Sequence, residues 1–344
     1  MPALTDLIAA YIDRWHNPYL LKLIFNSADP ASIAQRIDTF CHAEMGSPLD
    51  ETVFFAASQG LVFGVRLRDG RRIVIKVHKP GRAPSFLSGV GTVQRYLADA
   101  GYPCPHPLLG PRPCGQGLAM VEDLIDEGVY HDAHDAVYRR SLAEMLAWLI
   151  RLTRHPETIP GLNPSVLDLR LPSGVLWPTP HSNIFDFEAT WAGAEWIDEI
   201  ALSSKAIIDM SVGELVIGHG DWSIKHIRYV GERVRVIYDW DSLTLNKEPV
   251  LVGQSAVGFT YTEFFPVAWF PSAEEARAFV NEYEETRGKP FNTDERKMLA
   301  AAATYGLAYA ARCEYSLHPQ EQVYPANSAR ALLARYGESF ITFD

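Results

Sequence analysis

The chain has little cysteine, with four residues of this type among 344. Cys41, Cys104, Cys114 and Cys313 are scattered along the sequence, and their spacing is not that of zinc ligands. Reduced thiols in a reducing cytoplasm account most simply for this usage. We therefore expect a cytoplasmic protein without a disulfide framework.

The sequence also lacks a surplus of basic residues. It has 31 Lys and Arg against 42 Asp and Glu, which gives a formal net charge of -11. Nucleic acids are bound through basic faces, so we expect no nucleic-acid partner. The acidic balance suits a cationic small molecule, although mild acidity is common among cytoplasmic proteins.

No uninterrupted apolar run approaches the ~20 residues that a membrane-spanning helix needs. The N-terminal segment MPALTDLIAAYIDRW carries Asp6 where a secretion signal has basic residues, and no small-residue cleavage site follows an apolar run. We therefore expect neither a membrane span nor a secretion signal. The sequence does not indicate an oligomeric state.

Apolar residues are plentiful, at 47% of the chain, which suffices for a large core and two lobes. The first part reads mainly as a sheet, and Asp69-Gly70 is a typical hairpin turn between two of its strands. The prolines between 103 and 113 indicate an edge strand. The patterns predict helices over 3–15, 30–43 and 85–100, and strands over 52–56, 61–68, 72–78 and 118–122.

Beyond residue 122 the pattern becomes mainly helical. A further hairpin is predicted where 227–230 and 233–238 straddle Gly231-Glu232. Helices are predicted over 135–154, 195–210, 249–265, 273–287, 293–316 and 327–337. The sequence thus predicts an α+β protein: a lobe over 1–122, with an antiparallel sheet, one inserted helix and a helical N-terminal extension, and a mostly helical lobe over 123–344.

The most informative stretch is His219-Gly220-Asp221, with His226 five residues and Asp239 eighteen residues after Asp221. The predicted hairpin lies between the two acids, so one Asp follows a short apolar run and the other ends a strand. Rigid elements that bring two carboxylates together suit a site for Mg²⁺ and phosphate.

This arrangement resembles the catalytic centre of the aminoglycoside phosphotransferase and choline kinase family, relatives of the protein kinases. The family pattern is H-G-D-x-x-x-x-N followed by a hairpin and I-D-W, and the chain has HGDWSIKH and IYDW. The resemblance implies a protein-kinase-like fold. It also implies that Asp221 receives the proton of the attacking hydroxyl, that Asp239 holds Mg²⁺ and that His219 supports the loop backbone. Asp241, two residues on, either joins the metal shell or faces solvent.

The predicted third strand, Ile73-Val74-Ile75-Lys76-Val77, resembles the V-A-I-K strand of kinases. The resemblance implies that Lys76 reaches the phosphates of ATP, although a strand lysine is more often solvated. Ser58 and Gly60, in the turn between the first two strands, would cover the phosphates, or they form an ordinary hairpin turn. Backbone groups at the hinge would bind the adenine, and the alternative donor GTP stays open. The hinge residues are Glu122, Asp123 and Leu124.

Two departures from the family pattern are visible. His226 stands where the family has an Asn that holds a second metal ion. His226 either ligates the metal through nitrogen, which suits Mn²⁺ or Zn²⁺ better than Mg²⁺, or hydrogen-bonds to Asp221 or a phosphate in a one-metal site, or marks a loss of catalysis. Secondly, the helix after the Lys76 strand has no Glu to pair with that lysine. Gln94 could hydrogen-bond to Lys76, and otherwise a carboxylate arrives from elsewhere or Lys76 is held more loosely.

The resemblance covers about residues 50 to 270 and implies a phosphotransferase that uses ATP and Mg²⁺, or Mn²⁺, to phosphorylate a hydroxyl of a small molecule, aminoglycoside-like or another metabolite. The main alternative is a nucleotide-binding pseudokinase that acts by binding a partner. A kinase acting on proteins is less favoured because the chain lacks an obvious D-F-G and A-P-E activation segment.

The acceptor would lie near the C-terminal helices in such a protein. Acids there would suit an amino sugar, and aromatic residues would suit a quaternary ammonium or an apolar acceptor, unless they form a solvated helix face and a core. The candidate acids are Glu263, Glu282, Glu284, Glu285 and Glu314, and the candidate aromatic residues are Tyr261, Phe264, Phe265, Trp269, Phe270 and Tyr315.

Overall fold

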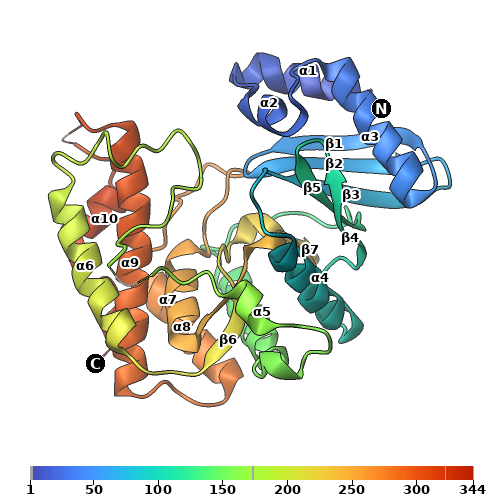
Figure 1. Ribbon diagram of the computed structural model, residues 1–344. Helices are drawn as coiled ribbons and strands as arrows, with labels where there is room; N and C mark the ends of the chain where they lie inside the picture. Colours follow the sequence, from blue (N-terminus) through green and yellow to red (C-terminus); the bar gives the residue numbers. More distant parts are fainter. Residues whose placement is uncertain (1–2, 173, 322, 344) are drawn as a thin grey trace. The chain divides into compact units, whose positions relative to one another are not determined.

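A computed structural model describes residues 3–172, 174–321 and 323–343 (Figure 1). The chain divides into two units, the first ending at Asp126 and the second beginning at Glu127. Each unit has its own sheet strands and its own helices. No helix in the described part of the chain is both long and apolar enough to cross a membrane.

The first unit contains a five-stranded sheet in which every neighbouring pair of strands is antiparallel. The strand order is β1-β2-β3-β5-β4. The proline-rich stretch forms β4 at one edge of the sheet, as predicted. Proline has no backbone N–H, so it cannot hydrogen-bond to neighbouring strands on both sides. The strands are β1 (Leu49–Ala57), β2 (Gly60–Leu67), β3 (Arg72–His78), β4 (Pro107–Cys114) and β5 (Gly117–Asp123).

Four helices accompany this sheet. Figure 1 shows α1 and α2 above one face of the sheet and α4 beneath the other. The predicted start of α3 is confirmed, because Asp29 caps the helix by accepting the backbone N–H of Ser32 at 2.8 Å and Pro30 opens its first turn. The short helix α2 was not predicted. The helices are α1 (Leu4–Trp15), α2 (Tyr19–Phe25), α3 (Pro30–Met45) and α4 (Pro84–Asp99).

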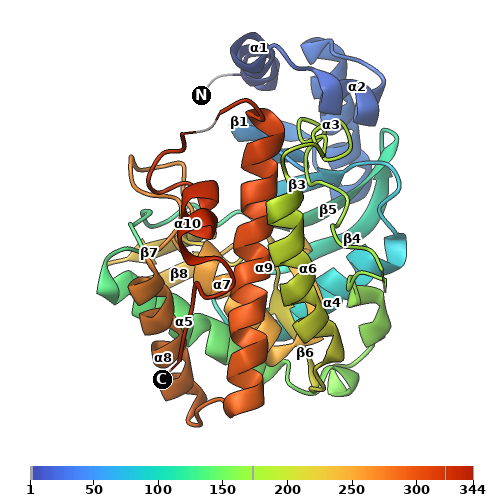
Figure 2. The same ribbon diagram turned by 90° about the vertical axis from the view of Figure 1, so that its left-hand side faces the viewer.

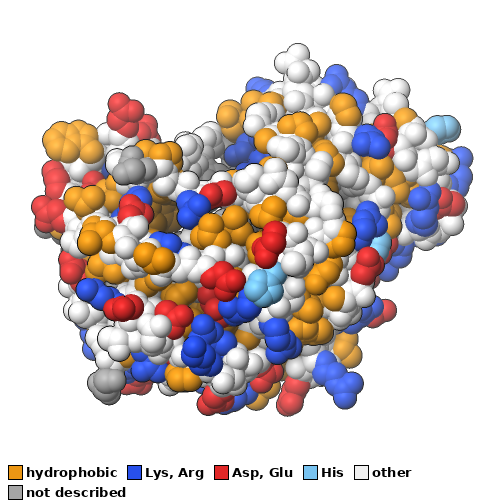
Figure 3. Space-filling model, turned by 60° about the horizontal axis from the view of Figure 1, so that its bottom comes forward, with side chains coloured by type: hydrophobic (Ala, Val, Ile, Leu, Met, Phe, Trp, Pro, Cys, Tyr) orange, Lys and Arg blue, Asp and Glu red, His pale blue; other side chains and the backbone are white. Residues whose placement is uncertain are grey.

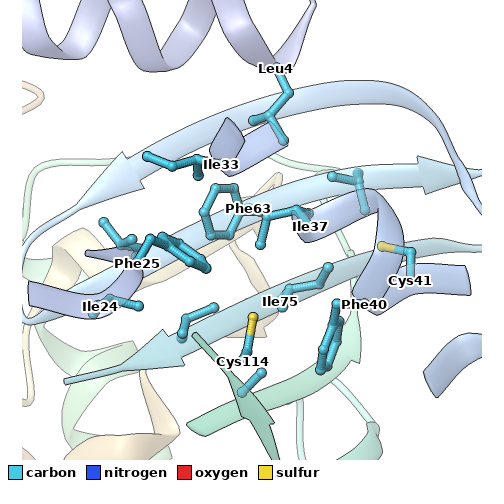
Figure 4. Close-up of a cluster of buried hydrophobic side chains, with 14 of the residues drawn as sticks. Leu4, Ile24, Phe25, Ile33, Ile37, Phe40, Cys41, Phe63, Ile75 and Cys114 are labelled. Carbon is cyan, nitrogen blue, oxygen red and sulfur yellow. The ribbon is translucent and has the colours of Figure 1, made fainter. Parts of the chain in front are cut away.

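A buried apolar cluster joins the first three helices to the sheet (Figure 4). Phe63 and Ile75 lie on neighbouring strands, and Phe25 and Ile37 approach them from α2 and α3. All four side chains are fully buried, and each such burial is worth roughly 1.5 to 3 kcal/mol. The N-terminal helices are therefore part of the core of this unit.

The second unit is mostly helical. Figure 2 shows the long helix α9 running beside α6, and α7 also packs against α9. The helices are α5 (Ala136–Leu152), α6 (Glu195–Met210), α7 (Glu248–Gly258), α8 (Ala273–Arg287), α9 (Thr293–Leu317) and α10 (Ala329–Tyr336).

One helix ends earlier than predicted. The apolar pattern extends to residue 265, but α7 ends at Gly258. The carbonyl of Phe259 accepts the N–H of Ile224 at 2.9 Å, and the Thr260 hydroxyl donates to the carbonyl of Trp269. These bonds to other segments replace the helical ladder, so the prediction for 259–265 was wrong.

Two small antiparallel sheets complete the second unit. The predicted hairpin is confirmed as β7 (Ile227–Val230) and β8 (Arg233–Ile237). The second sheet pairs β6 (Leu215–His219) with β9 (Leu243–Lys247), a strand that was not predicted. The two pairs bring the loop after β6 and the turn after β8 together, which positions the candidate site.

Surface charges of both signs are mixed. Exposed pairs such as Arg140 and Glu285 form ion pairs, and acidic and basic side chains lie beside one another on the face shown in Figure 3. All four cysteines are buried and free of disulfides. The pKa of Cys41, Cys114 and Cys313 is raised to about 12, mainly because these thiols are buried.

Candidate active site

The candidate site begins at the end of β6, where the chain leaves the sheet at His219. Gly220 follows, and its N–H donates to the carbonyl of Ser242 at 2.7 Å. A Cβ atom at Gly220 would lie 3.2 Å from that same carbonyl oxygen, so a side chain here would crowd the contact. The loop that carries Asp221 is thereby tied to the turn that follows Asp239.

The buried ring of His219 makes a second tie between these segments. Its Nδ1 accepts the backbone N–H of Asp221, and its Nε2 lies 3.3 Å from the carbonyl oxygen of Tyr238. One nitrogen must accept and the other must donate, which is the pattern of a neutral imidazole. Burial lowers the pKa of His219, in agreement with a neutral ring.

Asp239 has an unusual backbone conformation, with φ 67° and ψ 41°. This left-handed region costs a non-glycine residue about 1 to 3 kcal/mol, and Asp tolerates it better than most. The turn is held by the N–H of Ser242, which donates to the carbonyl of Asp239, and by the Ser242 hydroxyl, which donates to Oδ2 of Asp239 at 2.6 Å. The surrounding bonds therefore hold the Asp239 carboxylate in place.

Asp221, His226 and Asp239 form a compact cluster. Each offers one ligand atom, and these atoms all lie within 4.8 Å of one another. The Nε2 of His226 is 3.0 Å from Oδ2 of Asp221 and 3.7 Å from Oδ2 of Asp239. The 3-10 turn Ile224–His226 returns the chain toward Asp221, and the His226 carbonyl accepts the N–H of Tyr238.

The Asp221 carboxylate is held in its ionised form. Partial burial would raise its pKa, but the hydrogen bond and charge of His226, together with the Lys225 ammonium 2.9 Å away, hold the pKa of Asp221 well below its usual range. Its side chain is still 46% exposed. An ionised carboxylate that a small molecule reaches from solvent is suited to accept a proton.

The donor set of the cluster fits a divalent cation. Carboxylate oxygens suit hard ions such as Mg²⁺, and an imidazole nitrogen widens the preference toward Mn²⁺ or Zn²⁺. Asp241, one residue past Trp240 in the 3-10 turn Trp240–Ser242, is outside the cluster that the described residues form.

In the family pattern, the carboxylate that pairs with the strand lysine lies on the following helix. In the first unit of this chain, Lys76 pairs instead with a carboxylate on a strand. Its Nζ lies 3.0 Å from Oε1 of Glu122 on β5, and Gln94 on α4 donates to Oε2 of Glu122 at 2.7 Å. The sequence predicts Glu122 at the hinge, where its backbone would contact the adenine. The structure commits its buried side chain to Lys76.

The other nucleotide-binding candidates also lie in the first unit. The N–H groups of Asp123 and Leu124 donate to the carbonyls of His106 and Arg72. In the turn between β1 and β2, the N–H of Ser58 donates to the carbonyl of Gly60. These four residues are therefore placed by hydrogen bonds within their own unit.

Gly60 has a clear packing reason to be glycine, because a Cβ atom there would lie 2.5 Å from the carbonyl oxygen of Val77 on β3. A positively charged side chain that the sequence did not indicate lies beside the same turn. Lys79, just beyond β3, donates from Nζ to the side-chain oxygen of Gln59 at 3.3 Å. Burial lowers the pKa of Lys79.

Two further contributors were missed, the Ser242 hydroxyl and the side chain of Glu122. A serine three residues after an acid in a turn is a weak signal for a hydrogen bond back to that acid. An acid at the end of a strand usually indicates a solvated position, so the sequence around Glu122 carried no signal for burial.

The candidate acceptor acids are mostly engaged elsewhere. Glu282 is buried against Arg139 at 3.0 Å, so its assignment to a solvated face was wrong. Tyr261 donates its hydroxyl to Glu263 at 3.2 Å and lies beside the catalytic candidates, with Lys225 Nζ 4.5 Å from its ring centre. The remaining acids pair as Glu284 with Arg296, Glu285 with Arg140, and Glu314 with the N–H groups of Ala329 and Arg330.

Comparison with known proteins identifies the fold. No protein-family model and no curated protein sequence matches the chain. Among solved structures it is similar to an amicoumacin kinase in complex with AMP-PNP, Ca²⁺ and amicoumacin, with a TM-score of 0.58 and 14% identity over 91% of this chain and 98% of that one.

A spectinomycin phosphotransferase in complex with ADP and spectinomycin has a TM-score of 0.54 and 14% identity, over 89% of this chain and 98% of that one. An ethanolamine kinase from Plasmodium vivax has a TM-score of 0.51 and 10% identity, over 91% and 89% respectively. The chain therefore has a protein-kinase-like α+β fold, as predicted. Within that class, its fold is similar to the folds of an aminoglycoside phosphotransferase, the spectinomycin phosphotransferase and the ethanolamine kinase.

Proposed function

We propose that this protein is a small-molecule kinase that transfers the γ-phosphate of ATP to a hydroxyl group. The observation that carries the proposal is the cluster of Asp221, His226 and Asp239, whose ligand atoms lie within 4.8 Å of one another in a kinase-like fold. Nucleotides are present in the similar structures of the amicoumacin kinase and the spectinomycin phosphotransferase, which supports ATP as the donor and leaves GTP as the alternative.

Asp221 is the proposed catalytic residue. Its carboxylate orients the acceptor hydroxyl while the hydroxyl oxygen bonds to the γ-phosphorus and the bond from that phosphorus to the β,γ-bridging oxygen breaks. The hydroxyl proton passes to Asp221 late in the transfer. The pKa of Asp221 is held below its usual range, so the carboxylate is ionised throughout the neutral range and carries no proton when the transfer begins.

Asp239 and His226 are the residues that would hold a divalent cation, which supplies charge neutralisation at the phosphates. His219 and Ser242 support them from behind, since His219 ties the two loops and Ser242 binds the Asp239 carboxylate. Mg²⁺ is the proposed ion and Mn²⁺ the alternative that the imidazole favours.

Lys76 is the proposed phosphate-binding cation of the first unit. The turn at Ser58 and Gly60, with Lys79 bonded to it through Gln59, adds small residues and a second positive charge. Backbone groups near Glu122 and the two residues after it are the proposed adenine contacts.

The surroundings of Asp221 favour an acceptor with a ring or apolar face. Lys225 stacks on Tyr261, Tyr261 meets Trp269 edge-on at 5.3 Å, and Trp269 is about half exposed. Four of the five candidate acids are engaged in other pairs, so these contacts support a neutral alcohol more than a strongly cationic one.

A screen for ADP release tests the proposal. The protein would be incubated with ATP and Mg²⁺ or Mn²⁺ against aminoglycosides, macrolides, amino alcohols and sugars. An acceptor-dependent release that Asp221→Ala abolishes is the expected result. Unchanged turnover in that variant would exclude Asp221 as the proton acceptor.

A pseudokinase remains the second candidate, favoured by one observation. Oδ2 of Asp221 is in contact with both the Lys225 ammonium and the His226 imidazole, so the oxygen is occupied from two sides. Thermal stabilisation by ATP together with no turnover on any acceptor would support this candidate. A ligand at 100 times its Kd adds about 2.7 kcal/mol of stability, which a melting experiment resolves.

A further inference from the structure

We propose that Glu122, on strand β5, is the positioning residue for Lys76, and that it takes the place of the helix carboxylate which α4 lacks. The inference rests on the proposed function, because it assigns Lys76 to the nucleotide phosphates. The side chain of Glu122 does not touch the nucleotide in this proposal. It acts through the lysine.

The sheet register brings these two side chains together. Lys76 on β3 pairs with Met120 on β5, and Glu122 lies two residues further along the same strand. Residues two apart in a strand share a face, so Lys76 and Glu122 are diagonal neighbours on the α4 side of the sheet. Their charged atoms meet at 3.0 Å.

Both members of the pair are largely withdrawn from water. The side chain of Glu122 is 6% exposed and that of Lys76 is 13% exposed. A buried ion pair gains little over an apolar pair of similar size, whereas removing one partner leaves an uncompensated charge. Stability alone therefore does not account for two charges at this place in a central sheet, and a functional use of the lysine does.

Gln94 completes the arrangement. Its amide nitrogen donates to Oε2 of Glu122 at 2.7 Å and to the carbonyl of Pro105 at 2.9 Å, which uses both of its hydrogens. Oε1 of Glu122 is left to face Lys76. The segment α4, Pro84–Asp99, contains no Glu, so this helix supplies an amide that orients a carboxylate from the sheet.

This arrangement has a mechanical consequence. When the carboxylate belongs to a helix, displacement of the helix separates it from the lysine. Here Lys76 and Glu122 belong to adjacent hydrogen-bonded strands, so their distance is set by the sheet. The lysine is held ready without any movement of α4.

Glu122→Gln tests the proposal because it keeps the shape and removes the charge. We expect kcat/KM to fall about 100-fold, mainly through kcat, because a misplaced positioning group costs on that order. Glu122→Asp, which keeps the charge on a shorter arm, should recover part of the loss. Glu51→Gln is the matched control: Glu51 lies on β1 of the same sheet and pairs with Arg66 at 3.0 Å, and its variant should stay within about twofold of the native kcat/KM.

A double-mutant cycle measured by thermal unfolding separates a positioning role of Glu122 from a role in stability. Lys76→Met and Glu122→Met should each lower Tm, and the double variant should recover most of the loss, since an apolar pair replaces two charges. Activity should not return in the double variant. A folded Glu122→Gln protein with kcat/KM within twofold of native would overturn the proposal and leave Glu122 a structural residue.

Binding of AMP-PNP, measured by calorimetry, distinguishes failure of this inference from failure of the proposed function. If the native protein binds AMP-PNP without turnover, the kinase proposal fails. Glu122 is then still supported if Glu122→Gln and Lys76→Met weaken binding and their effects are not additive. If turnover is absent, equal AMP-PNP affinity in native protein and Glu122→Gln overturns the inference, and so does a lack of nucleotide binding by the native protein.

Discussion

The Nε2 atom of His226 lies 3.0 Å from Oδ2 of Asp221. This contact places a nitrogen ligand where the resembling family has an asparagine oxygen, and it joins the residue proposed to take the proton to the residue proposed to hold metal. The proposed chemistry of the site therefore depends on both members of this pair.

Asp221→Asn should reduce acceptor-dependent ADP release by about 10² to 10⁴-fold, because an amide cannot take the hydroxyl proton. The fold should be unaffected, as the side chain is half exposed. Asp209→Asn is a matched control, since Asp209 on α6 also pairs with a lysine four residues away, Lys205. Its activity should be native. A comparable loss in the control would point to a general effect of charge on folding.

His226→Asn should shift the metal preference of the reaction. Replacing an imidazole nitrogen with a carbonyl oxygen favours Mg²⁺ over Mn²⁺, because Mg²⁺ prefers oxygen ligands. The ratio of kcat/KM with Mg²⁺ to that with Mn²⁺ should rise severalfold in the variant. The ratio serves as its own control for loss of folded protein. An unchanged ratio would show that His226 does not ligate the ion.

Stability should depend on pH through His134 and Glu275. Nδ1 of His134 lies 2.8 Å from Oε1 of Glu275, and Nε2 lies 2.9 Å from the carbonyl of Ala268. Both partners are acceptors, so both nitrogens donate and the ring is positively charged. Burial opposes this, but the two acceptors raise the pKa of His134. Burial would likewise raise the pKa of Glu275, but the N–H of Ser272 and the contact with His134 lower it.

A raised histidine pKa gives stability that is fully present below about pH 6.5 and is lost as pH rises through the folded-state value. The lowered pKa of Glu275 gives stability that is present above about pH 4.5 and is lost in acid. His134→Gln should therefore cost about 1 kcal/mol at pH 6 and less at pH 9, measured by urea unfolding. A cost that is the same at both pH values would show that the ring is neutral in the folded protein.

Gly60→Ala should destabilise the first unit by about 1 to 3 kcal/mol, because the added Cβ would lie 2.5 Å from the backbone oxygen of Val77 and the strands would have to separate. Gly110→Ala is the control on β4, where a Cβ has open space. The control should stay within about 0.5 kcal/mol of native in urea unfolding. Equal effects of the two changes would show that the contact with the Val77 carbonyl oxygen does not set the cost of Gly60→Ala.

Local patterns predicted much of the fold. Asp29 and Pro30 opened α3 as expected, and the strands around Asp69-Gly70 formed the expected hairpin. Predictions failed where the decisive bonds come from distant segments. The carbonyl of Phe259 binds Ile224, which ends α7, and β9 exists because it pairs with β6. Neither partner is visible in a local window of sequence.

The same distinction applies to the candidate site: the sequence shows its local motifs but not the contacts between distant segments. The spacing of Asp221, His226 and Asp239 and the strand that carries Lys76 were evident from the sequence, because they lie on short motifs whose residue types carry the chemistry. The partner of Lys76 was not, since a carboxylate at the end of β5 resembles a solvated strand end until the strand order places it beside β3.

The sequence by itself thus determined the class of fold and the hairpin that separates the two aspartates, and it suggested the reaction class that we propose. Tertiary structure alone decided that Glu122 and Gln94 hold Lys76, that His219 ties the two aspartate loops and that four candidate acceptor acids are engaged elsewhere. The physical reason is that backbone propensity and turn chemistry act over a few residues, whereas the pairing of buried charges depends on which strands and helices become neighbours.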